Sequence, residues 1–166
     1  ILDLHELAAG KAAALLARSA PRDIFDSRAL LATPGLDPAK LRLGFVIYGG
    51  INRKDWRTVS STDVRVDANE VQTELVPVLR SDLAPARGNV AEWTDNLVAE
   101  CRERLSALLP LKEAEMEFLR RLNDQGDIAP ELLTGDVGLQ ETIRLHPGLL
   151  WKALNVRKHR GLGDGG

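Results

Sequence analysis

The sequence predicts a mainly α protein, an irregular multi-helix bundle of roughly seven to nine helices. Ala and Leu dominate the periodic stretches, where apolar residues recur at spacings of three and four. That spacing is typical of a helix that buries one face, and Ala and Leu are strong helix formers. Aromatic residues make up only 4% of the chain and alternating β-branched runs are rare, so little in the sequence favours strands.

The first third of the chain predicts three helices separated by proline-marked turns. Pro21 follows the first apolar stretch, and Pro34 with Gly35 follows the second. Asp37 has the residue type of a helix cap and precedes Pro38, which suits a first helical turn. We expect these helices over residues 4–17, 22–31 and 38–50.

The middle of the chain is polar and irregular, and its alternating run Val64–Asp67 predicts a short strand. A helix is expected over residues 70–79, kinked or ended by Pro77. The clearest helical pattern covers residues 90–108 and stops at Pro110. Further helices are expected over residues 111–122, 130–133, 138–145 and 147–159. We expect one helical domain over residues 1–160 and a disordered tail over residues 161–166.

Bulk properties limit the class of protein. The only cysteine, Cys101, excludes an internal disulfide and fits a reducing cytoplasm, and its place on an apolar stripe predicts a small buried side chain. The three histidines lie far apart in sequence, so we expect no zinc site. No apolar run approaches the roughly 20 residues that span a bilayer, so we expect no membrane partner. The net charge of −2 gives no general attraction to nucleic acid.

The most informative stretch runs from Lys11 to Asp26. Lys11 and Arg18 are two helical turns apart and share a face, while Arg22, Asp23 and Asp26 follow the proline turn. Cations that bind phosphates beside carboxylates suit nucleotidyl transfer. The other interpretation is a pair of solvated helix faces, on which Arg22 and Asp26 form an ordinary i,i+4 pair.

This stretch, K-AAALLA-R-SAP-RD-IF-D, resembles the K…R…RD..D motif of the AbiEii/AbiGii-type nucleotidyltransferase toxin family. The far end of the chain is also similar to the closing segments of that family. The similar segments there are residues 120–126, 128–134, 146–153 and 155–157. The resemblance covers nearly the whole chain in the right order, and is least diagnostic over residues 51–86.

The resemblance implies the C-terminal part of an α+β nucleotidyltransferase, a bacterial cytoplasmic toxin with an antitoxin partner. The complete protein would use a nucleoside triphosphate and Mg²⁺ to transfer a nucleotide to an RNA such as tRNA. Lys11 would contact the phosphates together with Arg18 and Arg22. Asp23 would be the catalytic carboxylate and act with Lys11, and Asp26 would support the site.

The chain departs from the family pattern in one respect. The family has a Gly-Ser turn followed by a D-x-D pair on an N-terminal sheet, and Gly49-Gly50 with Asp63 and Asp67 does not match it in spacing or order. Because the first residue is Ile1, we expect that sheet domain upstream. Its D-x-D carboxylates would hold the metal, so we expect no metal site in this chain. We therefore expect the chain alone to be inactive. The alternative is a helical domain that binds an antitoxin or another protein and has no catalytic role.

The last predicted helix gathers cations that could contact the phosphates of tRNA, namely Lys152, Arg157, Lys158 and Arg160, with His159 among them. The other interpretation is a solvated helix end, because cations favour helix C-termini. Trp151 is predicted to be a core or inter-helix anchor, and the alternative is a platform on which a base stacks. Trp56, in a basic loop, fits either a nucleic-acid contact or an indole tucked onto the core.

Overall fold

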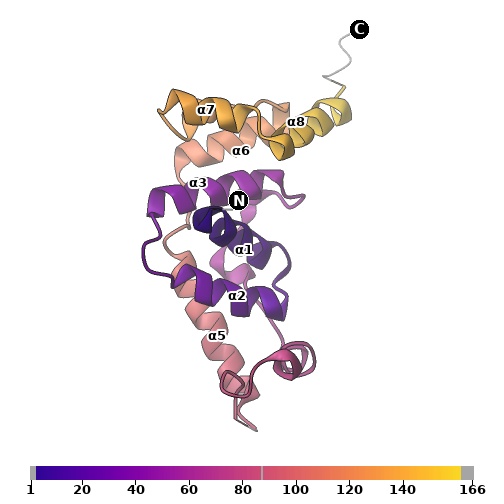
Figure 1. Cartoon of the computed structure of the whole chain (residues 1–166). Helices are drawn as coiled ribbons and strands as arrows, with labels where there is room; N and C mark the ends of the chain where they lie inside the picture. The colour runs from indigo at the N-terminus through magenta and orange to yellow at the C-terminus, as the bar shows by residue number, and fades with distance from the viewer. Residues whose placement is uncertain (1–2, 87, 162–166) are drawn as a thin grey trace. The chain divides into compact units, whose positions relative to one another are not determined.

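The computed structural model describes residues 3–86 and 88–161, and over these residues it contains eight α-helices and no β-strand. The prediction of a mainly helical chain is confirmed. Figure 1 shows the longer helices in chain order. The helices are α1 (Leu4–Arg18), α2 (Pro21–Leu31), α3 (Pro38–Ile51), α4 (Ala68–Glu70), α5 (Val90–Leu105), α6 (Glu113–Gln125), α7 (Val137–Arg144) and α8 (Pro147–His159).

Short turns of tighter or wider helix supplement these. The four 3₁₀ turns are η1 (Trp56–Thr58), η2 (Ser61–Asp63), η4 (Val76–Val78) and η5 (Pro130–Leu132), and one π turn is η3 (Val71–Leu75). The helix expected over residues 70–79 is therefore a succession of α4, η3 and η4. Pro77 has no backbone N–H to donate, which prevents a regular helix from continuing there.

The strand predicted over Val64–Asp67 is wrong. Val64 is fully buried, and its carbonyl oxygen accepts a hydrogen bond from the Arg102 guanidinium at 2.8 Å. The backbone N–H of Arg65 is donated to the hydroxyl of Ser19. The alternating residues Val64–Asp67 belong to a segment without regular secondary structure, whose backbone N–H and carbonyl groups bind side chains. Among the described residues no strand lies beside it.

The chain forms two compact units. Unit 1 consists of Ile1–Arg42 and Ser60–Leu109, and unit 2 of Leu43–Val59 and Pro110–Gly166. One domain over residues 1–160 stays a prediction. Of the predicted tail 161–166, Gly161 lies in a turn and residues 162–166 lie outside the described residues.

Unit 1 is built on α2, which packs against α1 and α5. The small side chains of Ala8, Ala9 and Ala12 are fully buried on α1 and permit a close approach of its neighbours. Cys101 of α5 is also fully buried, as predicted, and its Sγ lies 3.3 Å from the Ile24 carbonyl oxygen. Burial raises the pKa of the Cys101 thiol to about 11.

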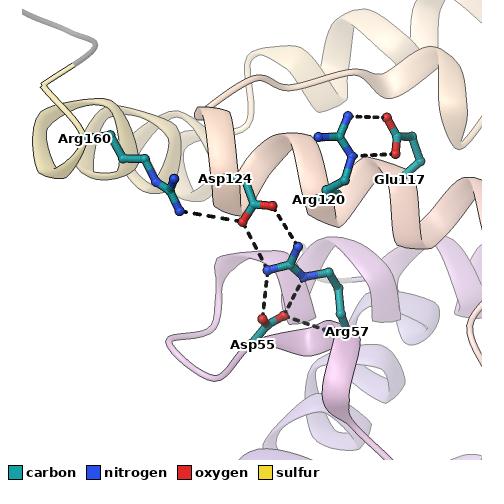
Figure 2. A network of polar contacts seen from close by, with 6 residues as sticks. All are labelled: Asp55, Arg57, Glu117, Arg120, Asp124 and Arg160. Carbon is teal, nitrogen blue, oxygen red and sulfur yellow. Dashed lines mark hydrogen bonds and ion pairs between the residues drawn. The ribbon is translucent and has the colours of Figure 1, made fainter.

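Unit 2 is built on α6, which packs against α8 and η1. Trp56 of η1 is fully buried, with its ring 5.5 Å from that of Phe45, so the interpretation of Trp56 as a core residue is confirmed. Arg57 follows it and donates to Asp55 and to Asp124 of α6. Figure 2 shows this arginine between its two carboxylates.

In the part of the chain that the structure describes, the helices are too short or too polar to cross a lipid bilayer.

Candidate functional site

The predicted site residues lie along the seam of α1 and α2 in unit 1. α1 carries Lys11 and, in its last turn, Arg18, while the start of α2 carries Arg22, Asp23 and Asp26. Pro21 takes the first position of α2, where its missing N–H costs nothing. An acid in the first turn of a helix and a base in the last turn are both favoured by the helix dipole. The helix dipoles therefore favour Arg18 in the last turn of α1 and Asp23 in the first turn of α2.

Arg18 and Asp23 form a forked ion pair. Arg18 Nε donates to one carboxylate oxygen of Asp23 at 2.6 Å, and Nη2 donates to the other at 3.0 Å. The Asp23 side chain is only 2% exposed, whereas that of Arg18 is 67% exposed. This hydrogen bonding raises the pKa of the Arg18 guanidinium. A buried carboxylate therefore holds an exposed guanidinium in a fixed orientation.

A second ion-pair group forms around Asp26. The ammonium of Lys11 lies 3.3 Å from Asp26 Oδ2, and Arg22 Nε lies 3.6 Å from the same oxygen. Ser27, which is fully buried, donates its hydroxyl to the Lys11 carbonyl oxygen at 3.1 Å and ties the two helices together here. Lys11 thus pairs with Asp26, and not with Asp23.

The corner between α1 and α2 is formed by Ser19, which is not among the predicted site residues. Ser19 has a φ of 50°, which is uncommon for a residue other than glycine. Its hydroxyl lies 2.8 and 3.0 Å from the carbonyl oxygens of Leu15 and Asp63, and accepts the N–H of Arg65 at 3.3 Å. These contacts hold the strained corner that separates Arg18 from α2. Gly or Asn is the usual sign of such a conformation, so a serine at this position does not predict it.

The seam brings three cations and two carboxylates together in two groups, and can hold an anion. Arg18 and Arg22 expose about two thirds of their side chains, 67% and 68%, so their outward donors are accessible to phosphate oxygens. For a metal ion the described residues offer less, because they include no group of three or more His, Cys, Asp or Glu side chains arranged to hold one.

The cations predicted to contact RNA lie on α8 or, for Arg160, just after it in unit 2, and two of them bind backbone carbonyls. The ammonium of Lys152 donates to the Asn52 carbonyl oxygen at 2.6 Å, and burial lowers its pKa. Arg157 Nε donates to the Gly126 carbonyl oxygen at 2.9 Å. Lys158 is exposed, and Arg160 lies 3.9 Å from Asp124. These four side chains therefore do not form one uniform patch.

The prediction that Trp151 is a core anchor is wrong. Its side chain is 56% exposed on α8 and lines an open groove in unit 2 with Asn155 and Arg53. From the sequence, Arg53 belongs to the basic loop around Trp56 and Asn155 to a segment similar to the family's end. Their place in one groove was not predicted, because no periodic pattern links a loop arginine to a helix several elements later. The helix was predicted correctly, but its buried face was not.

No protein-family model, no curated protein and no solved structure matches this chain.

Proposed function

We propose that this chain is the helical part of a nucleotidyltransferase toxin, whose α1–α2 seam binds the phosphates of a nucleoside triphosphate. The nucleotide would pass to an acceptor hydroxyl, such as one on tRNA. The observation that supports this is the forked pair of Arg18 and Asp23, in which a 2% exposed carboxylate orients a largely exposed guanidinium. Arg22 and Lys11 add two further cations on the same seam.

The chemistry rests mainly on positioning and neutralisation of charge. A triphosphate at the seam competes with Asp23 for Arg18, because phosphate and carboxylate accept from a guanidinium in the same forked geometry. When the phosphates take Arg18, an oxygen of Asp23 becomes free to accept the proton of the acceptor hydroxyl. The acceptor oxygen then bonds to the α-phosphorus, and pyrophosphate leaves.

Mg²⁺ would neutralise charge on the phosphates in the complete protein. The described residues do not fit a site for it, since both carboxylates of the seam are already paired with cations. The proposal therefore assigns no step of this chain's residues to the metal.

The test is transfer of labelled nucleotide to RNA by the protein made from the complete gene. Asp23→Asn should lower transfer by about 100-fold or more, the range of a lost catalytic proton acceptor. Lys11→Gln should also lower transfer, because it removes a cation from the phosphates. The matched controls are Lys40→Gln and Asp95→Asn, two exposed residues away from the seam, which should transfer normally. Circular dichroism should show that all four variants fold. Transfer within twofold of the parent in both seam variants would refute the proposal.

The alternative is a helical domain that binds an antitoxin or another protein. It is favoured by large apolar side chains that remain exposed on and beside α7 and α8, namely Val137, Leu145, Leu150 and Leu154. Leu150 and Leu154 are four residues apart and so share one face of α8. If the seam variants retain toxicity while Leu150→Glu with Leu154→Glu abolishes binding of the antitoxin or other partner protein, this alternative is correct.

A further inference from the structure

An open groove lies along α8 in unit 2, with a volume of about 810 Å³. One side is formed by Trp151, Asn155 and His159, which are spaced four residues apart and therefore lie along one face of the helix. Arg53, just beyond the end of α3, and Arg160, just after α8, also line the groove. The volume is in the range that holds a small-molecule or nucleotide-sized ligand.

Trp151 gives the groove an accessible aromatic surface. Its side chain is 56% exposed, whereas Trp56 of the same unit is fully buried. An indole exposed to water does not contribute the favourable free energy that burial of a Trp side chain ordinarily provides. Stacking a planar ligand on it recovers part of that energy, and every nucleobase offers such a plane.

The charge of the groove is positive. Arg53, Lys152 and Arg160 line it, and no carboxylate is among its lining residues in the described chain. Lys152 is fixed by its hydrogen bond to the Asn52 carbonyl oxygen. The guanidinium of Arg160 lies 3.9 Å from the nearer carboxylate oxygen of Asp124, and Figure 2 shows the two side chains facing each other. At that distance a phosphate can compete for Arg160 at little cost.

We infer that this groove binds single-stranded nucleic acid, with a base stacked on Trp151 and the backbone phosphates on Arg53 and Arg160. Asn155 lies one turn from Trp151, where its amide can reach the edge of the stacked base. A nucleic-acid duplex fits the groove less well, because its bases are already stacked on one another. An acidic peptide would pair with the cations but has no nucleobase to stack on the indole. The site lies wholly in unit 2 and does not depend on the transfer proposed for the seam in unit 1.

The test is fluorescence anisotropy of a labelled 12-nucleotide oligouridylate titrated with the whole chain at several salt concentrations. Trp151→Ala should weaken binding by about 5- to 150-fold, the range of one lost base stack, and Trp151→Phe should restore much of it. Arg160→Ala and Arg53→Ala should each lower the slope of log K against log salt by about 0.7, the value for one phosphate of a single strand.

Arg144→Ala is the matched control. It removes the same charge from the same unit, at an exposed position on α7 that does not line the groove, and should leave the affinity within about twofold. Equal losses in Arg144→Ala and Arg160→Ala would overturn the inference, since they would show general attraction to the phosphates. Unchanged binding in Trp151→Ala, or no binding at low salt, would also overturn it.

Three competitors decide what occupies the groove. Unlabelled oligouridylate should compete, and so should a single-stranded DNA of the same length. Equal competition by a duplex of that length or by polyglutamate would exclude a single-stranded ligand. Uridine monophosphate that binds as tightly as the oligomer would show a site for a free nucleotide and would likewise overturn the inference.

Discussion

At the scale of single residues, Gly49 is the glycine of unit 2, among the described residues, at which an added side chain would have least room. A Cβ atom there would lie 2.0 Å from Nε1 of Trp56, whose indole is fully buried. The indole has little space to move away, because it is fully buried and packs with its ring 5.5 Å from that of Phe45. Only a residue without a side chain permits α3 and η1 to approach this closely.

Gly49→Ala should therefore destabilise the protein by about 3 kcal/mol, the upper end of the usual cost of overpacking. Gly50→Ala is the matched control on the same helix. Its Cβ would meet the tips of leucine side chains, the nearest being that of Leu122 at 2.9 Å, and such tips can move. Urea unfolding followed by tryptophan fluorescence measures both variants. Equal midpoints for the two would contradict the packing described for Trp56.

Arg57 links η1 to α6 and pairs with two carboxylates at once. It lies 2.9 Å from Asp55 and 3.0 Å from Asp124, with 24% of its side chain exposed. Hydrogen bonding to Arg57 lowers the pKa of Asp55, which therefore stabilises the folded state above its ordinary pKa of 3.8. That stability is lost as the pH falls through the lowered value.

Arg57→Ala should destabilise the protein at pH 7 by about 1–2 kcal/mol, within the range of hydrogen bonds to charged groups. The loss should shrink below pH 3.8, because protonated Asp55 no longer attracts the guanidinium in the parent. Arg120→Ala is the control, since Arg120 pairs with Glu117 on the exposed surface of α6. Figure 2 shows both arginines. A pH-independent difference between Arg57→Ala and the parent would show that the ion pairs contribute nothing.

At the scale of elements, α1 carries a glycine that its packing does not require. A Cβ atom at Gly10 would meet no other atom within 4 Å. Gly10→Ala should therefore stabilise the protein by about 0.5–1 kcal/mol through helix propensity. Ala14→Gly, one turn further on the same face, should have the opposite effect of similar size. Thermal unfolding followed by circular dichroism checks both, and destabilisation by Gly10→Ala would contradict the open space described there.

The helices were predictable because each depends on local signals. Apolar spacing located α1, α5 and α6, and Pro38 and Pro147 marked the starts of α3 and α8. The strand expected over Val64–Asp67 failed because side chains from distant segments bind its backbone. α5 ends at Leu105, short of Pro110, because a tight turn joins the N–H of Leu108 to the Leu105 carbonyl oxygen.

The candidate site was predictable as a cluster but not as a set of pairs. Helical spacing indicated that Lys11, Arg18 and the acids of α2 share one region. Which cation pairs with which carboxylate depends on how α1 packs on α2, and residue spacing along the sequence does not predict that packing. The forked bond from Arg18 to Asp23, and the depth of that carboxylate, are consequences of packing.

At the scale of the whole molecule, the proposed transfer depends on a set of carboxylates for a divalent metal. The described residues include no such group, and both acids of the seam are paired with cations. This chain alone should therefore transfer no labelled nucleotide to tRNA above background, with Mg²⁺ present. Robust incorporation, abolished by Asp23→Asn, would show that the chain completes the site unaided.

The three tryptophans fall in three environments, and this has a practical consequence. Trp56 is fully buried and Trp151 is 56% exposed, both in unit 2, whereas Trp93 lies half-buried against Phe25 in unit 1. Emission from an indole shifts to the red as water reaches it. Replacing two of the three with phenylalanine would leave one intrinsic optical reporter. The order in which the units melt could then be recorded without attaching any dye.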